Sequence, residues 1–324
     1  MNVLVTGATG FVGGHLVDRL LSQGDTVTAL VRSPQRAKSL TSQGVRLVVG
    51  DLANETALAE AVAGQGVIYH AAAMLGARND QELLVANRDG TARVVAAAEA
   101  SGDTPHFVLV SSMAAGGPAR HGTPKYGNDA DRPVTGYGRS KLAAEKVVTA
   151  SQLSWTIVRP PVVYGPGDRD GMLPLFKFVS HGLAPMFGSG AMEISLVHVV
   201  DLADAIAMAG SEPGARGGVF YVNYPEVFTS ADLMRTIAAV MGRSVMPLPI
   251  PRWATRGVLA ITGTWATLAR QKSILRPDKI HEFYQEAWTA DPEAFMTATG
   301  WSPQFDLNTG IADTAAWYRA QRWI

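Results

Sequence analysis

Cysteine is absent from the 324 residues of the chain. Its absence excludes a disulfide framework, a thiolate metal site and a cysteine nucleophile, and it suits a reducing cytoplasm, where we expect the protein to work. An excess of one charge is also missing, because 28 basic residues balance 28 acidic ones. We therefore expect no nucleic-acid partner. The histidines are scattered without ligand spacing, so we predict no metal site.

Long apolar runs are missing as well, since none reaches the roughly 20 residues that a membrane-spanning helix needs. The longest candidate, Trp253 to Ala269, is interrupted by Arg256, two glycines and several threonines. We interpret it as a core or lid helix rather than a membrane contact. The chain runs from Met1 directly into a strand and a glycine turn, so we expect no signal peptide.

The first half of the chain alternates short apolar runs with amphipathic helical patterns. Short β-branched runs separated by helices indicate βαβ units and a parallel sheet with helices on both faces. The sequence therefore predicts a doubly wound α/β fold. The clearest predicted strands are Val3–Val5, Thr26–Val31, Val45–Gly50, His106–Ser112 and Trp155–Pro160.

After Pro160 many prolines and glycines interrupt this alternation. Two later apolar patches, Ile194–Ala209 and Gly218–Asn223, are predicted to return to the sheet. We expect a dinucleotide-binding domain over residues 1–165, with returning segments at about 194–224. Residues 166–193 and 225–324 would form a smaller C-terminal lobe that binds the substrate.

The stretch "VTGATGFVGG" places Gly7, Gly10 and Gly13 between the first strand and the first helix. Glycines here permit a tight turn and close approach of the backbone to a pyrophosphate, and the helix N-terminus favours the anion. The strand before and the helix after match the context that a Rossmann-type motif requires. We assign cofactor binding to the turn residues Gly7, Thr9, Gly10, Phe11 and Val12.

The end of the second predicted strand reads "ALVRSPQR", with Arg32 where a ribose-binding carboxylate would otherwise stand. No acidic residue occurs between Asp25 and Asp51, and an arginine accommodates a 2′-phosphate. Arg32 is either that ligand or an ordinary solvated charge, and the missing acid favours NADP(H) over NAD(H). Asp51, followed by Leu52, is either a contact to the adenine edge or a helix-capping acid.

Tyr137 and Lys141 stand one turn apart on the predicted helix from Thr135 to Val147. Their side chains leave the same face, where a nearby ammonium would lower the pKa of the phenol towards the working pH of a proton-transfer catalyst. On the same helix we expect Leu142, Ala143 and Val147 to pack inward. Arg139, Glu145 and Lys146 are expected to remain in water.

A hydroxyl opposite this pair could hold the oxygen of a substrate. "VLVSSMAAGG" ends the fifth predicted strand at the carboxyl edge of the sheet, where doubly wound folds bind ligands. It offers Ser111 and Ser112.

Eight motifs in order resemble the extended short-chain dehydrogenases/reductases of the NAD(P)-dependent epimerase/dehydratase superfamily. They are "TGATGFVG", "GDL", "HAAA", "NRDGT", "VSSMAAGG", "YGRSK", "RPPVVYGPGD" and "SLVHVVDLADAI". The resemblance implies an enzyme with Tyr137 as general acid/base, Lys141 as its modulator and ribose ligand, and Ser112 as the hydroxyl that holds the carbonyl. It also places Ala71, Ala72, Pro160 and Val163 along the cofactor.

Within this superfamily the chain departs from the sugar-nucleotide pattern. Pro161 stands where those enzymes have asparagine, and Glu193 and Ile194 stand where a basic residue binds the diphosphate. It is more similar to hydroxysteroid dehydrogenases and dihydroflavonol reductases, whose substrates are apolar. Apolar residues of the second lobe suit such a pocket, although each could equally be core: Met172, Leu173, Leu175, Phe176, Phe178, Met186, Phe187, Trp253 and Trp265.

We therefore predict an NADP(H)-dependent oxidoreductase that interconverts a ketone and a secondary alcohol on a hydrophobic or cyclic small molecule. The alternatives are a sugar-nucleotide epimerase or dehydratase with retained NAD(P), and an NADP-binding sensor without turnover. The resemblance also implies a homodimer formed through the helices near residues 87–100 and 137–151.

Overall fold

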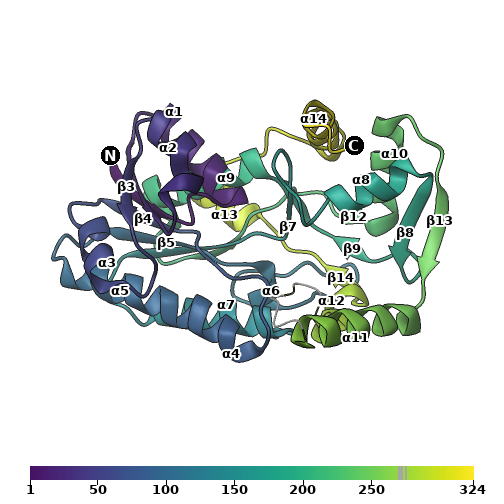
Figure 1. Cartoon of the computed structure of the whole chain (residues 1–324), viewed down its shortest axis with the longest axis horizontal. Coiled ribbons are helices and arrows are strands. Elements are labelled where there is room, and N and C mark those ends of the chain that lie inside the picture. The colour runs from purple at the N-terminus through teal and green to yellow at the C-terminus, as the bar shows by residue number, and fades with distance from the viewer. Residues whose placement is uncertain (269–272, 274–275) are drawn as a thin grey trace.

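The structure, a computed structural model, describes residues 1–268, 273 and 276–324, and the side chains of 1–260, 273 and 276–324. Strands and helices alternate through the first half of the chain (Figure 1). The elements in order are β1 (Asn2–Thr6), α1 (Phe11–Ser22), β2 (Thr26–Val31), α2 (Lys38–Ser42), β3 (Arg46–Val49), α3 (Glu55–Val62), β4 (Val67–His70), α4 (Asp80–Leu83), a π-helical turn (Leu84–Asp89), α5 (Gly90–Ala100), β5 (His106–Val110), α6 (Met113–Gly116), α7 (Gly136–Thr149) and β6 (Trp155–Arg159).

Seven parallel strands form the central sheet, in the order β11-β6-β5-β4-β1-β2-β3, where β11 is Val219–Tyr221. Val3 of β1 pairs with Val27 of β2 on one side and with Val67 of β4 on the other. The strand order therefore reverses direction at β1, and the ends of β1 and β4 form the switch point at which such sheets bind ligands. The predicted doubly wound Rossmann-type fold is confirmed.

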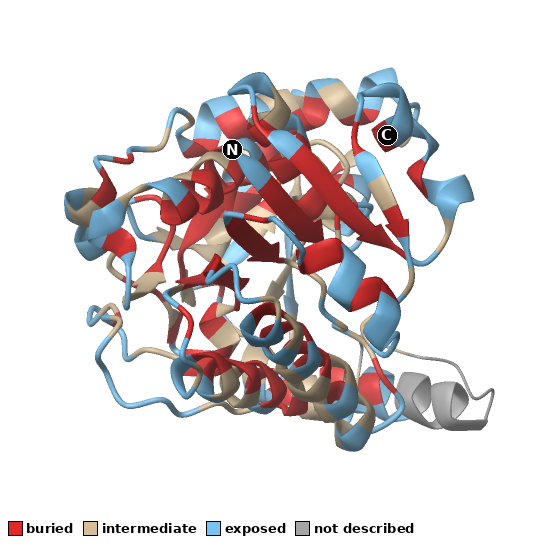
Figure 2. Cartoon of the chain, turned by 90° about the vertical axis from the view of Figure 1, so that its left-hand side faces the viewer, coloured by how far each residue is buried: buried red, intermediate tan, exposed pale blue. Residues whose placement is uncertain are grey.

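Helices cover both faces of the sheet and bury two separate layers of core (Figures 1 and 2). In β1, Val3 and Val5 face the layer under α1 and α9 (Val199–Ser211), whereas Leu4 faces the layer under α3, α5 and α7. All three side chains are fully buried. Each such burial contributes about 1.5–3 kcal/mol, which explains why these strands read as continuous apolar runs.

The smaller lobe lies beyond the carboxyl ends of the strands, with its own core around Phe176, Ile237 and Tyr318. Because this core is separate from the two layers around the main sheet, we propose the division into two domains that the sequence predicts. The remaining elements of the chain are β7 (Val162–Tyr164), α8 (Leu173–Ser180), β8 (Leu183–Phe187), β9 (Glu193–Ile194), β10 (Leu196–His198), β12 (Phe228–Thr229), α10 (Ser230–Met241), β13 (Met246–Ile250), α11 (Arg252–Leu268), α12 (Ile280–Phe283), β14 (Ala287–Trp288), α13 (Glu293–Thr299) and α14 (Leu307–Ala320).

The predicted return of Ile194–Ala209 to the main sheet is wrong. Its first residues belong to β9 and β10, and β10 pairs with β7 in a separate two-stranded sheet. From Val199 onward the chain is the helix α9, whose apolar positions face both α1 and the sheet and so imitate a buried strand. Only the second patch reaches the main sheet, as β11.

The apolar segment after Trp253 forms most of α11, and its first turns do not lie in the core. The side chain of Trp253 is 77% exposed, although Thr255 and Leu259 on the opposite side are buried. The side chain of Trp265 lies outside the described residues. Within the described part of the chain, every helix is too short or too polar to cross a membrane.

Candidate active site

Tyr137 and Ser112 meet at the carboxyl edge of the sheet. Tyr137 lies in the first turn of α7, which the side chain of Thr135 caps by accepting a hydrogen bond from Gly138 N at 3.2 Å. Ser112 follows β5 and caps the short helix α6 by accepting from Ala114 N at 3.1 Å. The Ser112 hydroxyl lies near enough to the phenol of Tyr137 to act on its pKa, and both residues are half-buried. They therefore remain accessible to a small molecule.

The expected lowering of the Tyr137 pKa by Lys141 is wrong for the free protein. Burial raises the pKa of Tyr137 to about 12, the hydrogen bond to Ser112 opposes this rise, and the negative charge of Glu282 adds to it. Lys141 is not among the main causes of this shift, and its Nζ donates a hydrogen bond to the carbonyl oxygen of Val110 at 2.7 Å. The phenol is thus protonated at neutral pH.

Lys141 is almost completely buried, with 2% of its surface exposed. Burial lowers the pKa of its ammonium group to about 8, and the charge of Glu145 counteracts part of that change. Lys141 therefore loses its proton near pH 8, well below the pH at which a lysine in water does so.

Glu145 is buried, so the expectation that it would stay in water is wrong. Its carboxylate accepts hydrogen bonds from Arg159 Nε at 3.0 Å and Arg159 Nη2 at 2.5 Å. Arg159 also pairs with Asp131 at 2.8 Å and contacts Tyr221. A buried charge is tolerated only when it is paired in this way. The spacing of residues 137, 141 and 145 on one helix face could have indicated this position.

The two serines after β5 point to different partners. Ser111 is buried, and its hydroxyl donates to the carboxylate of Glu145. Ser112 faces Tyr137 instead. Of the two, Ser112 alone combines a contact to the phenol with partial exposure.

Asn87 is a buried residue of this site that we did not predict. Its side chain accepts from Met74 N at 2.7 Å, donates to Met74 O at 3.0 Å and donates to Ser140 Oγ at 2.9 Å. It thereby ties the segment after β4 to α7 beside Lys141. Asn87 lies in a π-helical turn, a distortion that is frequent at functional sites, and the motif "NRDGT" was its only signal in the sequence.

The predicted glycine turn leads from β1 into α1. Gly7 has φ +77°, and a Cβ there would lie 2.7 Å from Ala72 N. A Cβ on Gly13 would lie 2.1 Å from Gly7 O, so the turn admits no side chain at either position. Gly10 caps α1 without a side-chain hydrogen bond, which leaves the first N–H groups of the helix open to an anion. The turn fits a dinucleotide.

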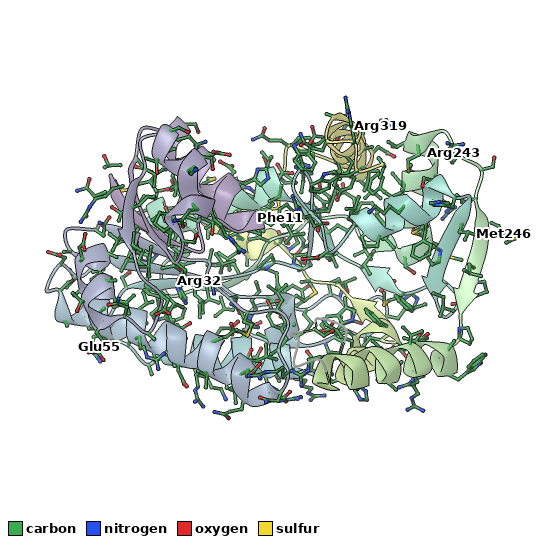
Figure 3. All side chains as sticks on the ribbon, in the orientation of Figure 1. Phe11, Arg32, Glu55, Arg243, Met246 and Arg319 are labelled. Carbon is green, nitrogen blue, oxygen red and sulfur yellow. The ribbon has the colours of Figure 1, made fainter. Side chains whose placement is uncertain are left out.

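The remaining turn residues surround this helix end. Thr9 is exposed, and Val12 is half-buried. Phe11, at the start of α1, is also half-buried (Figure 3). At the switch point, Ala71 N donates to Thr6 O at 3.2 Å and Ala72 N to Thr6 Oγ1 at 3.3 Å. The turn and the segment after β4 are therefore adjacent.

Arg32 is exposed directly after β2 (Figure 3). Asp51, after β3, is also exposed, and its Oδ1 accepts from Ala53 N at 2.8 Å. Asn54, not Asp51, caps α3, so the capping alternative for Asp51 is wrong. Leu52 packs against the core on the α5 side of the sheet.

The segment after β6 lies against the turn that contains Ser112. Pro160 O accepts from Met113 N at 2.9 Å. Val163 lies in β7, where it pairs with Val197 of β10 and packs against the core under α1. Pro160 and Ser112 are therefore close together, whereas Val163 belongs to the adjoining small sheet.

The apolar residues predicted to line a pocket differ in how far they are buried. Met172 and Phe176 are fully buried in the core of the smaller lobe. Phe187 is half-buried and its ring stacks on Phe283 with centroids 4.4 Å apart. Phe178 is 45% exposed on α8. Met172 and Phe176 thus serve the core.

Glu193, which stands where the family resemblance leads us to expect a basic residue in sugar-nucleotide enzymes, lies in β9. Its carboxylate accepts from Gly122 N at 2.8 Å and contacts His121 Nδ1 at 2.7 Å. An acid held in this way repels a diphosphate.

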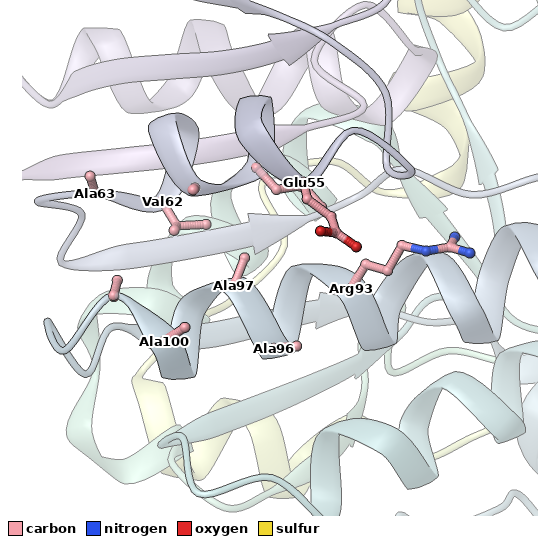
Figure 4. A pocket seen from close by; sticks show the side chains of 10 residues that line it. Glu55, Val62, Ala63, Arg93, Ala96, Ala97 and Ala100 are labelled. Atoms are coloured by element: carbon pink, nitrogen blue, oxygen red, sulfur yellow. The ribbon is translucent and has the colours of Figure 1, made fainter.

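A separate hollow lies between α3 and α5, on the face of the sheet away from α1 (Figure 4). Glu55 and Arg93 stand at one end of it, and small residues form most of its wall: Ala59, Ala63, Ala96, Ala97, Ala100 and Ser101. Tyr137 and Ser112 do not line it, so the hollow is separate from the candidate active site.

The fold and the glycine turn are those of an NAD(P)-dependent enzyme of the extended short-chain dehydrogenase/reductase class. Residues 3–222 match the NAD dependent epimerase/dehydratase family. The chain is 32% identical to the ceramide reductase of Caulobacter vibrioides over 99% of this chain and 96% of that protein. The chain therefore belongs to the NAD dependent epimerase/dehydratase family.

Another relative that matches over almost its whole length has a different activity. The chain is 29% identical to the UDP-glucose 4-epimerase of Vibrio cholerae, over 97% of this chain and 94% of that protein. Among solved structures, MoeE5 in complex with UDP-glucuronic acid and NAD has a TM-score of 0.79 and 25% identity, with 99% of this chain and all of that chain covered. The family thus includes both reductases and epimerases.

Proposed function

We propose that the protein is an NADP(H)-dependent oxidoreductase that interconverts a ketone and a secondary alcohol on a hydrophobic small molecule. The observation that carries this proposal is the contact between Ser112 and Tyr137 at the carboxyl edge of the sheet. In that position one hydroxyl can hold a carbonyl oxygen while the other donates its proton. The similarity to a ceramide reductase supports a carbonyl substrate with apolar chains.

The residues of the glycine turn would hold the cofactor. The open N–H groups of α1 would bind the pyrophosphate, with Ala71 and Ala72 on one side and Pro160 and Val163 on the other. When bound, the nicotinamide supplies or accepts the hydride. Arg32 would bind the 2′-phosphate of NADP(H), since its guanidinium is exposed at the end of β2.

In the direction of reduction, Tyr137 acts as a general acid. Its pKa of about 12 keeps the phenol protonated at neutral pH, so the proton is available when negative charge develops on the substrate oxygen. Ser112 holds that oxygen through its hydroxyl. Lys141 would bind the ribose and place a positive charge near the phenol once its hydrogen bond to Val110 is exchanged.

The surroundings of β9 favour an apolar substrate over a sugar nucleotide. Glu193 and Pro161 occupy the positions at which sugar-nucleotide enzymes need a cation and an asparagine. The Glu193 carboxylate is fixed by His121 and Gly122, so it cannot turn away easily from an incoming diphosphate.

We also propose that the enzyme is a homodimer in the cytoplasm. α5 and α7 lie side by side on one face of the sheet, and the exposed small residues of α5 would permit close packing of a second copy. The absence of cysteine suits the reducing compartment.

The experiment that tests the proposed activity is a comparison of substrates. NADPH oxidation should occur with long-chain ketones, and UDP-glucose or UDP-glucuronic acid should neither bind nor be epimerised. The opposite result, binding of a UDP-sugar together with tightly retained NAD, would identify an epimerase. Binding of NADPH without turnover of any ketone or alcohol would identify a sensor.

A further inference from the structure

The outer edge of the smaller lobe exposes large apolar side chains on two consecutive elements. Among the residues that the structure describes, β13 pairs only with β8 and is an edge strand, and Pro251 leads from it directly into α11 (Figure 1). Met246 is 62% exposed, Leu248 38% and Trp253 77%. Met246 points outward from the strand (Figure 3). Exposed apolar groups on adjoining elements of this kind indicate a binding surface.

The same segment is strongly basic, in a chain with no net charge. No acidic residue occurs from Leu233 to Pro277, whereas this stretch contains Arg235, Arg243, Arg252, Arg256, Arg270, Lys272 and Arg276. Arg243, Arg252 and Arg256 are exposed, and none of the three forms an ion pair within the described part of the chain. Arg252 lies over the ring of Tyr284, 5.9 Å from its centroid.

We propose that this surface, the docking edge (Arg243, Met246, Leu248, Arg252, Trp253 and Arg256), binds the enzyme to an anionic lipid bilayer. Tryptophan prefers the membrane–water interface, and a methionine and a leucine beside it add apolar area to bury among the acyl chains. The arginines would bind lipid phosphate groups and be attracted by the negative surface potential. Docking by this edge does not depend on the reaction that the enzyme catalyses.

The free edge of β13 cannot readily pair with a strand from a second chain. Met246 N donates inward to Gly182 O at 2.9 Å, so by alternation Pro247 and Pro249 face outward. Proline has no N–H, and the outer edge therefore lacks donors for strand addition. A symmetric second copy would also place arginines against arginines.

The docking edge also adjoins the candidate active site. Tyr284 OH donates to Ile250 O at 2.9 Å and contacts Thr255 at 2.6 Å. Glu282, two residues earlier, accepts from Thr135 Oγ1 at 3.2 Å at the start of α7. These contacts connect the docking edge, through α12, to the start of the helix that carries Tyr137.

Flotation of the full-length protein with lipid vesicles tests the proposal. The protein should float with vesicles of phosphatidylcholine and phosphatidylglycerol, more weakly with phosphatidylcholine alone, and less at high salt. Trp253→Glu should lower the partition coefficient by about tenfold. Its matched control is Val49→Glu on β3, where an apolar side chain is 55% exposed, and this variant should bind as the wild type does.

A second pair of variants tests the charges. Each basic residue near an anionic surface contributes about fivefold to binding. The double variant Arg243→Glu with Arg256→Glu should therefore weaken binding to the vesicles by at least about twentyfold. Arg319→Glu with Arg322→Glu, on exposed positions at the end of α14, is the control and should have little effect. Circular dichroism and thermal melting establish that each variant is folded.

Three results would overturn the proposal. The first is wild-type protein that stays with the soluble fraction at low salt in anionic vesicles. The second is a control variant, Val49→Glu or the Arg319→Glu/Arg322→Glu pair, that loses as much binding to vesicles as the docking-edge variant with which it is matched. The third is a dimer in analytical ultracentrifugation that Trp253→Glu dissociates, because the edge would then contact a second copy of the chain.

Discussion

Arg159 and Glu145 form a paired contact in the core, with Arg159 Nη2 donating to Glu145 Oε2 at 2.5 Å and both side chains almost inaccessible. Arg159 ends β6, and Glu145 stands one turn after Lys141 on α7. The pair therefore fixes α7 to the sheet directly beside Lys141.

Removing one partner of this pair should be strongly destabilising, because the other charge would remain buried. We expect Glu145→Leu or Arg159→Met to lower the free energy of unfolding by about 3–5 kcal/mol. The variant with both substitutions should lose less free energy of unfolding than the sum of the two single losses, and urea unfolding measures all three. Arg139→Met, which breaks an exposed pair with Asp80, should cost about 1 kcal/mol or less. Strict additivity of the two core substitutions would contradict this account.

Tyr137→Phe should reduce the turnover of a ketone substrate by about a thousandfold, since it removes the proton donor and leaves the ring in place. Affinity for NADPH, measured from its fluorescence, should change little. Tyr126→Phe is the control, because Tyr126 is 51% exposed in a loop. Turnover that survives in Tyr137→Phe would remove this residue from the mechanism.

Arg32→Asp should shift the preference of the enzyme from NADP(H) towards NAD(H). The carboxylate would repel a 2′-phosphate and accept hydrogen bonds from ribose hydroxyls, so we expect the ratio of kcat/KM values to change by about tenfold or more. The same substitution at Arg46, an exposed residue of β3 paired with Glu60, should leave the ratio unchanged. An unaltered ratio in Arg32→Asp would mean that Arg32 is only a solvated charge.

Lys141→Met should stabilise the protein at neutral pH while it abolishes activity. Lys141 titrates at about pH 8 in the folded protein and near 10.5 in an unfolded chain, so the unfolded chain binds more protons between these values. The penalty for burying the ammonium is complete below about pH 8 and fades as the pH rises to 10.5. We expect a gain of about 2 kcal/mol at pH 7 that disappears at alkaline pH.

Thermal unfolding across this pH range measures the effect. Lys146→Met, on the exposed side of the same helix, is the control and should show no such dependence on pH. A stability gain in Lys141→Met that is constant from pH 7 to 10.5 would show that the ammonium is not destabilised by burial.

The sequence predicted the strands of the main sheet closely, because their burial on both faces requires continuous apolar runs. The predicted strand Thr26–Val31 has the same bounds as β2. α9 was mistaken for a strand because a helix buried on most sides has no visible period.

The site was harder to predict wherever a residue depends on a distant partner. We predicted Glu145 to be a solvated acid, and its charge is tolerated in the interior because it pairs with Arg159, 14 residues later in the chain. The pKa of Tyr137 was misjudged for the same reason, since the burial that raises it and the charge of Glu282 both come from tertiary packing.

The start of α7 is completed by the smaller lobe. Gly136 N donates to Asp278 Oδ2 at 2.8 Å, and Thr135 donates to Glu282. A chimaera that exchanges this lobe for that of a relative, as one would do to redesign specificity, must therefore keep both acids. Without these acids, the first turn of α7 would lose its hydrogen bonds to Asp278 and Glu282. The new substrate would then bind beside a less firmly held helix.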